Sequence, residues 1–224
     1  MSIRNLLLAG AMMLAVAAPL AAQDAAKLCM AIGHMQNGQW AEFETDAKGP
    51  NGERIEGFRF AVVGDEDVGG TSHLWYEFSA RTEQGPLIVQ FLVPGFPFEP
   101  TDIRSMVMKA GDDPAVKLPK QMLAMASGQM GTNPMVKMAD ECQGAELVGE
   151  EDITVPAGTF HTTHIRDAGG GGEAWISEDI PFGLVKVRET GGMTMALVGH
   201  GTDATSSITE TPQEFTMPGM GRQP

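Results

Sequence analysis

The 224-residue chain contains little cysteine, few aromatic residues and few basic residues. It has two cysteines, one tyrosine and three tryptophans, and its 15 lysines and arginines are outnumbered by 29 aspartates and glutamates. The formal net charge at pH 7 is −14. A surface of this sign repels phosphate backbones and anionic lipid headgroups at long range. We therefore expect no nucleic-acid partner.

Long hydrophobic runs are also scarce, and the clearest one lies at the N-terminus. The apolar run from Leu6 to Ala18 follows the positively charged Arg4, and small residues at Ala21 and Ala22 suit cleavage by a signal peptidase. The run is shorter than the roughly 20 residues of a membrane span. We expect residues 1–22 to be a signal peptide and the protein to be periplasmic or otherwise exported. A retained N-terminal anchor is the alternative.

The two cysteines, Cys29 and Cys142, both follow this segment. An even number of cysteines in an oxidising compartment favours one disulfide. Closing so long a loop would stabilise the fold by about 4–5 kcal/mol through the unfolded state. Two free buried thiols and a metal-binding pair are the alternatives.

Motifs of catalysis and cofactor binding are missing. The chain has no Gly-x-Ser-x-Gly elbow, and the glycine run Gly169–Gly172 lacks the Lys-Ser/Thr of a phosphate-binding loop. That run is more typical of a hairpin connection. The five histidines are scattered, with no serine or aspartate partner evident in the sequence. We expect no enzymatic activity, no metal site and no cofactor.

Alternation of apolar and polar residues dominates most of the chain and predicts about ten short strands in hairpin order. Phe58, Phe60 and Val62, for example, share one face of a strand while Arg59 points to the other. The segment 85–95 is apolar on both faces, which predicts a strand that is covered on both sides. Its one face carries Leu87, Val89, Phe91 and Val93, and its other face carries Ile88 and Leu92.

The stretch "VPAGTFHTTHIRD", residues 155–167, combines turn residues with two histidines. Pro156-Ala157-Gly158 predicts a three-residue hairpin loop in which Gly158 is left-handed and forms a bulge. His161 and His164 then lie three residues apart on the outgoing strand. Strand side chains alternate between faces, so the two imidazoles point to opposite sides of the sheet. This spacing disfavours a shared metal ion, because structural zinc needs four converging ligands.

Methionine is abundant, with 16 in the chain. Within residues 119–144, Met122, Met125 and Met130 follow helical spacing after Pro119, and Asn133-Pro134 predicts the start of a second short helix that ends near Cys142. Another short helix is predicted over residues 24–32. The methionines can simply fill a core, because the thioether adapts to irregular gaps. They can instead line a deformable apolar cleft between helix and sheet that accepts lipid-like ligands. Capture of Cu(I) by Met217 and Met220 is a third option.

The segments "ITVPAGTFHTTHIRD" and "AWISEDIPFGLVKV", within residues 153–187, carry a family resemblance. They resemble exported bacterial proteins of the LolA-like periplasmic lipoprotein-carrier superfamily, or of a related uncharacterised exported family. The resemblance implies a strongly curved antiparallel sheet, an incomplete barrel, with helices plugging its concave side. In carrier members that space holds acyl chains. No ligand-binding motif of the carriers is evident, so the resemblance assigns no functional residue.

These observations together predict an α+β fold: a strongly curved antiparallel sheet, or incomplete barrel, with short helices packed on the concave side. Residues 23–210 are expected to form one domain, and residues 211–224 a flexible tail. The predicted function is non-catalytic binding or carriage of a lipid or another hydrophobic small molecule, with Phe91, Met122 and Met125 as ligand-binding residues. The alternative is an envelope scaffold with a filled core that contacts another envelope protein through its acidic surface.

Overall fold

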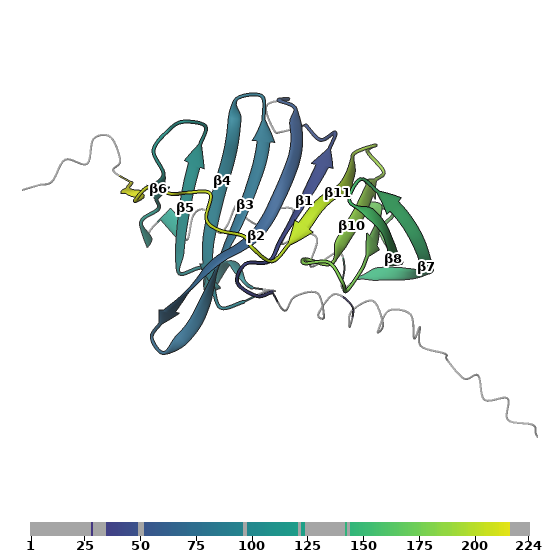
Figure 1. The fold of residues 1–224 in the computed structure, drawn as a ribbon, viewed down its shortest axis with the longest axis horizontal. Coiled ribbons are helices and arrows are strands. Elements are labelled where there is room, and N and C mark those ends of the chain that lie inside the picture. Colours follow the sequence, from purple (N-terminus) through teal and green to yellow (C-terminus); the bar gives the residue numbers. More distant parts are fainter. Residues whose placement is uncertain are drawn as a thin grey trace, which may run out of the picture.

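A computed structural model describes Leu28, Cys142 and residues 35–48, 52–95, 98–120, 122–123 and 144–215. They form one sheet of twelve strands (Figure 1). The strands are β1 (Trp40–Thr45), β2 (Ile55–Val68), β3 (Thr71–Thr82), β4 (Gly85–Val93), β5 (Ser105–Ala110), β6 (Val116–Lys117), β7 (Ala145–Val155), β8 (Gly158–Asp167), β9 (Gly172–Ile176), β10 (Leu184–Glu189), β11 (Thr194–Gly201) and β12 (Gln213–Glu214).

The strand order is β12-β6-β5-β4-β3-β2-β1-β11-β10-β9-β8-β7. All neighbours are antiparallel except β12 and β6, which are parallel. The first and last long strands meet in the middle, where Trp40 of β1 lies opposite Gly201 of β11. The predicted antiparallel sheet with hairpin connections is confirmed.

The predicted α+β class, with short helices packed on the concave side, is wrong. Among the described residues, only one helical element has a defined start and end, and it is the single 3-10 turn Pro100–Asp102. Helical periodicity in residues 24–32 and 119–144 predicts a helix layer, but most of both segments lies outside the described residues. The described faces of the sheet are packed instead by side chains from loops and by a C-terminal segment. A local period shows which side chains share a face, and it does not show what covers that face.

The stretch "VPAGTF" forms the predicted hairpin, but with a shorter loop. Val155 lies opposite Gly158, so only Pro156 and Ala157 connect β7 to β8. Gly158 has a positive φ of 139°, which suits glycine, but the register is regular at this point. The irregularity of this strand pair lies further along, between Leu147 and Gly149.

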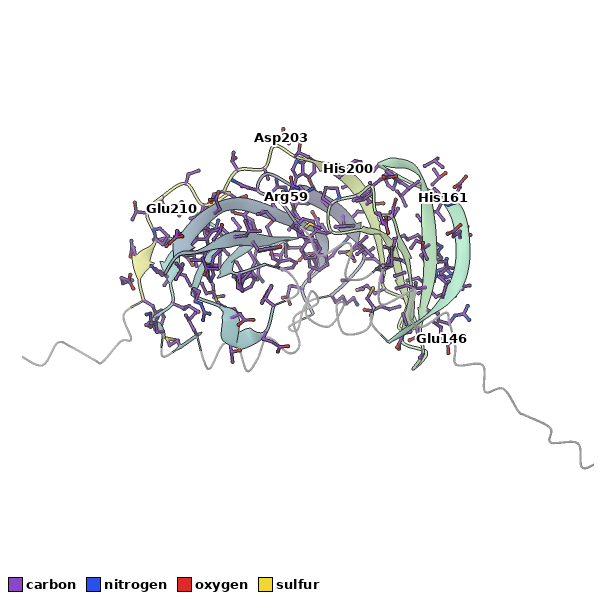
Figure 2. All side chains as sticks on the ribbon, turned by 90° about the horizontal axis from the view of Figure 1, so that it is seen from below. Arg59, Glu146, His161, His200, Asp203 and Glu210 are labelled. Carbon is purple, nitrogen blue, oxygen red and sulfur yellow. The ribbon has the colours of Figure 1, made fainter. Side chains whose placement is uncertain are left out.

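The strand β4 is covered on both faces, as its sequence predicts. Phe91 and Val93 on one face, and Ile88 and Leu92 on the other, are each at most 5% exposed. The sheet arches, and Arg59, Asp203 and Glu210 lie on its convex side (Figure 2). Because side chains alternate along a strand, Phe58 and Phe60 lie on the concave side, opposite Arg59.

The convex side is crossed by residues 202–212, which we call the strap (yellow-green in Figure 1, between β11 and β12). Ile208 of the strap packs into an apolar cluster with Ile88, Val107 and Ala115. Glu210 of the strap pairs with Lys109 of β5 at 2.5 Å. The strap ends in β12, where Gln213 lies opposite Val116 of β6.

A second, smaller core cluster lies beneath β7, β8 and β9. It contains Cys142, Ala145, Ile165 and Ile176, and Leu28 packs against it. Cys142 is 6% exposed, and the described residues include no free cysteine. Cys29 follows Leu28 directly in the sequence but lies outside the described residues. The Cys29–Cys142 disulfide therefore stays a prediction, one that the position of Leu28 supports.

Candidate functional site

The concave side of the sheet carries a connected cluster of aromatic rings, which we call the aromatic face. Strands β1 to β4 contribute rings in register, since Phe60 lies opposite Phe78 and Tyr76 lies opposite Phe91. Neighbouring ring centroids are 5.3–6.4 Å apart. The cluster includes seven of the ten phenylalanines and the only tyrosine: Phe43, Phe58, Phe60, Tyr76, Phe78, Phe91, Phe98 and Phe182.

Two loops place further apolar groups over these strands. Phe98 comes from the connection between β4 and β5, and its ring lies 6.4 Å from both Tyr76 and Phe91. Phe182 comes from the connection between β9 and β10 and contacts Phe60 and Tyr76. Phe182 has a φ of 64°, a conformation that costs a bulky residue roughly 1–3 kcal/mol. Burial of its ring in the aromatic face offsets this cost.

The aromatic face is apolar and offers few groups for chemistry. Tyr76 is 1% exposed, and burial raises the pKa of its hydroxyl above the ordinary value of 10.0. Partly buried apolar side chains, including Met35, Leu118 and Leu123, pack against the aromatic face.

The three predicted ligand-binding residues have different positions. Phe91 is 3% exposed and lies within the aromatic face. Met122 is half-buried and lies in a helical turn, since its amide donates to the carbonyl of Pro119 at 2.9 Å. Leu123, the next residue, packs against the aromatic face. Met125 lies outside the described residues.

The convex side carries a different kind of site, a polar pocket of about 450 Å³ lined by Trp40, Arg59, Asp203, Thr205, Ser206 and Ser207. The Trp40 indole donates to Asp203 at 2.8 Å, and the Arg59 guanidinium lies over the indole at 5.2 Å. A Cβ added to Gly201 would lie 2.7 Å from the Trp40 ring, so this glycine leaves room for it. The Arg59 guanidinium therefore covers one face of the indole.

Beneath this pocket Glu77 is fully buried and holds the strap. Its carboxylate accepts hydrogen bonds from Gln90 at 2.8 Å and from the amide and hydroxyl of Ser207 at 2.9 and 2.6 Å. Arg59 lies 3.6 Å from the same carboxylate. Because these donors satisfy a buried charge, the group fastens the strap to the sheet. Sequence alternation placed Glu77 on the face opposite Tyr76 but did not reveal its burial.

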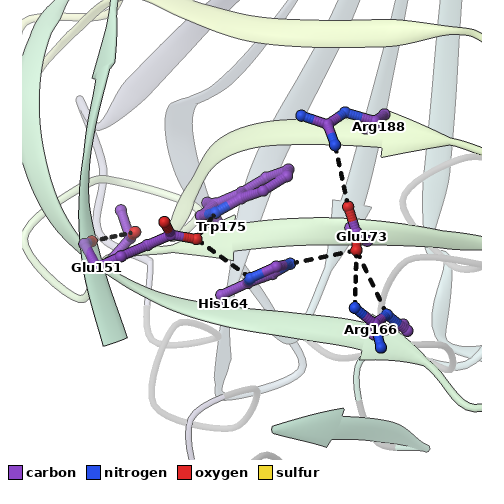
Figure 3. Close-up of polar contacts among 7 residues, drawn as sticks. Glu151, His164, Arg166, Glu173, Trp175 and Arg188 are labelled. Carbon is purple, nitrogen blue, oxygen red and sulfur yellow. Dashed lines mark hydrogen bonds and ion pairs between the residues drawn. The ribbon is translucent and has the colours of Figure 1, made fainter. Parts of the chain in front are cut away.

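A second polar network lies on β7 to β10 and is centred on Trp175, which is 5% exposed (Figure 3). His164 stacks on the indole with the ring centroids 4.5 Å apart. The Glu151 carboxylate accepts from the indole nitrogen at 2.7 Å and lies 3.2 Å from His164 Nδ1. Lys186 and Arg188 lie over the same ring at 5.3 and 5.2 Å.

Glu173 joins this network to two arginines. It accepts from Arg166 at 3.1 Å and lies 3.3 Å from Arg188 and 3.7 Å from His164 Nε2. The hydrogen bond from Arg166, with the nearby charges of His164, Arg166 and Arg188, holds the pKa of Glu173 below its ordinary value of 4.5. The network ties four strands together. In the sequence only the Trp175 segment indicates this network, because the residues of the network come from four separate strands.

His161 and His164 have separate neighbours, as strand alternation predicts. His161 is exposed and bonds to Asp152 at 2.8 Å, whereas His164 stacks on Trp175. That hydrogen bond, with the charges of Asp152 and Glu150, raises the pKa of His161 above 6.5. Among the described residues no group of three or more His, Cys, Asp or Glu side chains is placed to hold a metal ion. The described helical residues do not make up a membrane-spanning segment.

Comparison with known proteins finds only distant structural likeness. No protein-family model and no curated protein matches the chain. A predicted lipoprotein of Parabacteroides distasonis has a TM-score of 0.35 and 12% identity, over 76% of this chain and 98% of that chain. A predicted exported protein of Bacteroides fragilis with a YmcC-like fold has a TM-score of 0.33 and 12% identity, over 74% and 96%. MucB has a TM-score of 0.33 and 12% identity, over 83% of this chain and 61% of MucB. These values are too low to indicate what this chain binds.

Proposed function

We propose that this is an exported, non-catalytic protein that binds a hydrophobic ligand of the acyl-chain type against the aromatic face. Export rests on the predicted signal peptide at residues 1–22. The observation that carries the ligand is the aromatic face itself, which gathers most of the phenylalanines of an aromatic-poor chain on one side of the sheet. Most of these rings are already buried, so a ligand would contact the partly buried members Phe58, Phe78 and Phe98 and would gain about 25 cal/mol for each Å² of apolar area removed from water.

Adaptable side chains at the rim support the same proposal. Met35, Met122 and Leu123 come from segments outside the sheet and are each only partly buried. Met106 and Met108 extend the aromatic face onto β5, where they lie opposite Phe91 and Val89. Methionine can repack around ligands of different shape, because its thioether chain is flexible and polarizable. A ligand would enter beside these residues and not through the strands.

Direct detection of a bound lipid tests the proposal. The protein is expressed with its own N-terminal segment, extracted from the cell envelope and examined by native mass spectrometry. A mass shift matching a fatty acid or phospholipid is expected. Binding is then measured by titrating the delipidated protein with a fluorescent palmitate analogue.

A matched pair of variants locates the ligand. Met122→Glu places a charge at the half-buried rim, and we expect about tenfold weaker binding of the analogue, since a carboxylate must lose hydration beside the acyl chain. Val148→Glu makes the same kind of change on β7, away from the aromatic face, at a residue that is 46% exposed, and binding should stay within about twofold. Consistent recovery of empty protein, with no binding of the analogue, would rule the proposal out and leave the filled-core scaffold.

A further inference from the structure

The two ends of the twelve-stranded sheet differ in length and in protection. One end consists of β6 and of β12, which follows the strap, and each has two residues. The other end is β7, which has 11 residues and pairs with β8 on one side only among the described strands. An edge strand presents backbone N–H and C=O groups that can pair with an added strand. Among the described strands, the end at β7 therefore offers the longer unpaired edge for a partner.

The usable part of this edge is limited by its hairpin. The amide of Ala157 donates to the carbonyl of Leu197 at 3.1 Å, so the tip of the β7–β8 hairpin is tied to β11. The stretch from Glu146 to Asp152 precedes that tie and is mostly exposed. Val148 in this stretch is 46% exposed, which is high for a large apolar side chain in the described part. Seven residues of strand span about 23 Å, enough for a partner segment of similar length.

The stretch from Glu146 to Asp152 contains four carboxylates, and they lie on both faces of the strand. Glu150 and Asp152 lie near His161 at 3.7 and 2.8 Å, whereas Glu151 points to the opposite face, toward Trp175 and His164. Glu146 lies opposite Arg166, whose guanidinium bonds to Glu173. The strand β7 contains no lysine or arginine. The edge of β7 therefore carries negative charge on both faces of the sheet.

The negative charge of β7 determines which kind of strand can pair with its edge. Pairing of β7 with β7 of a second copy would bring carboxylates opposite carboxylates, and like charges across a strand pair are destabilising. Both copies would also carry a net charge of −14. A basic strand has the opposite sign and gains cross-strand ion pairs. The same carboxylates that prevent self-association select a basic partner.

We propose that the edge of β7, from Glu146 to Asp152, is a docking strand for an extended, lysine- or arginine-rich segment of another exported protein, which adds to the sheet as a thirteenth strand. Backbone hydrogen bonds supply the pairing, and the carboxylates supply the choice of partner. Because carboxylates occupy both faces, the fitting segment carries basic residues at adjacent as well as alternate positions. This site is independent of the aromatic face and of any hydrophobic ligand.

Two synthetic peptides separate strand addition from simple charge attraction. The first is a capped nine-residue peptide with four lysines distributed over both strand faces and valine or threonine between them. The second has the same sequence but carries N-methyl groups on alternate residues, which removes backbone donors without changing charge. Binding to the full-length mature protein is measured by fluorescence anisotropy. We expect the N-methylated peptide to bind at least about tenfold more weakly.

Two charge-reversal variants locate the peptide. Glu150→Lys with Asp152→Lys changes residues whose side chains are 71% and 69% exposed, so folding should be retained. Glu83→Lys with Asp112→Lys makes the same change in net charge at exposed turns far from β7 in the strand order. We expect about tenfold weaker binding for the β7 pair and no more than about twofold for the control. Equal binding of both peptides, or equal loss in both double variants, would overturn the proposal.

Discussion

Tyr76 and Glu77 are neighbours on β3, and they are 1% and 2% exposed, yet they face opposite sides of the sheet and opposite chemistry. Tyr76 lies among phenylalanine rings on the concave side. Glu77 lies beneath the strap on the convex side, where Gln90, Ser207 and Arg59 surround its carboxylate. One strand therefore supports two buried layers, one apolar and one polar.

The two layers stabilise the fold by different means. The aromatic face gains from removal of apolar area from water, a gain that does not depend on exact alignment of polar atoms. The layer under the strap holds a buried charge, so its stability depends on every donor to Glu77 being in place. We therefore expect the aromatic face to be sensitive to lost volume and the strap to be sensitive to single lost hydrogen bonds.

The largest effect is expected in the aromatic face. Phe60 is 4% exposed and contacts three other rings, so Phe60→Ala should lower the free energy of unfolding by about 3–5 kcal/mol through lost burial and a cavity. Urea unfolding followed by fluorescence measures this change. As the control, Met108→Ala at the exposed end of the same face should cost about 0.5 kcal/mol. Equal losses for the two variants would contradict a buried aromatic layer.

A smaller effect is expected under the strap. Glu77→Gln keeps the side-chain shape but removes the charge, and it should cost about 1–3 kcal/mol because donors from Gln90 and Ser207 lose an ionised acceptor. Hydrogen exchange should speed up in the strap, residues 202–212, more than in β3. Glu44→Gln changes an exposed glutamate of β1 and serves as the control. Unchanged exchange in the strap would show that Glu77 does not hold it.

The network around Trp175 should contribute less, and in a pH-dependent way. The pKa of Glu173 is lowered in the fold, so its contribution is present above the ordinary value of 4.5 and is lost as pH falls through the lowered folded pKa. Glu173→Gln should therefore destabilise the protein at about pH 7 and make little difference at about pH 3. Urea midpoints at the two pH values measure the difference. A constant difference between variant and parent would contradict this assignment.

The smallest effect is expected at exposed His161. Its pKa is raised, so its contribution is present below the ordinary value of 6.5 and is lost as pH rises through the raised folded pKa. The imidazole resonances should titrate with a midpoint above 6.5 in an NMR experiment. Asp152→Asn should lower that midpoint, because the hydrogen bond to Asp152 is the main cause of the shift. A midpoint unchanged by Asp152→Asn would exclude that cause.

Much of the sheet was predictable, because strand alternation and turn residues are local signals. The face shared by Phe58, Phe60 and Val62, the double coverage of β4 and the hairpin at Pro156 all follow from spacing of two and from turn chemistry. The separation of His161 from His164 follows from the same rule. Each of these inferences compares residues only a few positions apart.

What covers each face of the sheet could not be predicted in the same way. The stripe at Met122 suggested a helix layer, but no local pattern states what packs on a sheet, and the described faces are covered by loops and by the strap. The partners of Glu77 are over a hundred residues away in the strap. The partners of Trp175 come from three other strands.

The sequence by itself determined the antiparallel strands, their turns, the acidic surface and the side chains that share a face, since each depends on short-range spacing or on composition. Only the tertiary structure decided that both faces of β3 are buried, that the strap covers Glu77 and that the acidic strand β7 forms the long edge of the sheet. Those features depend on contacts between residues far apart along the chain, which form only when the strands assemble in their final order.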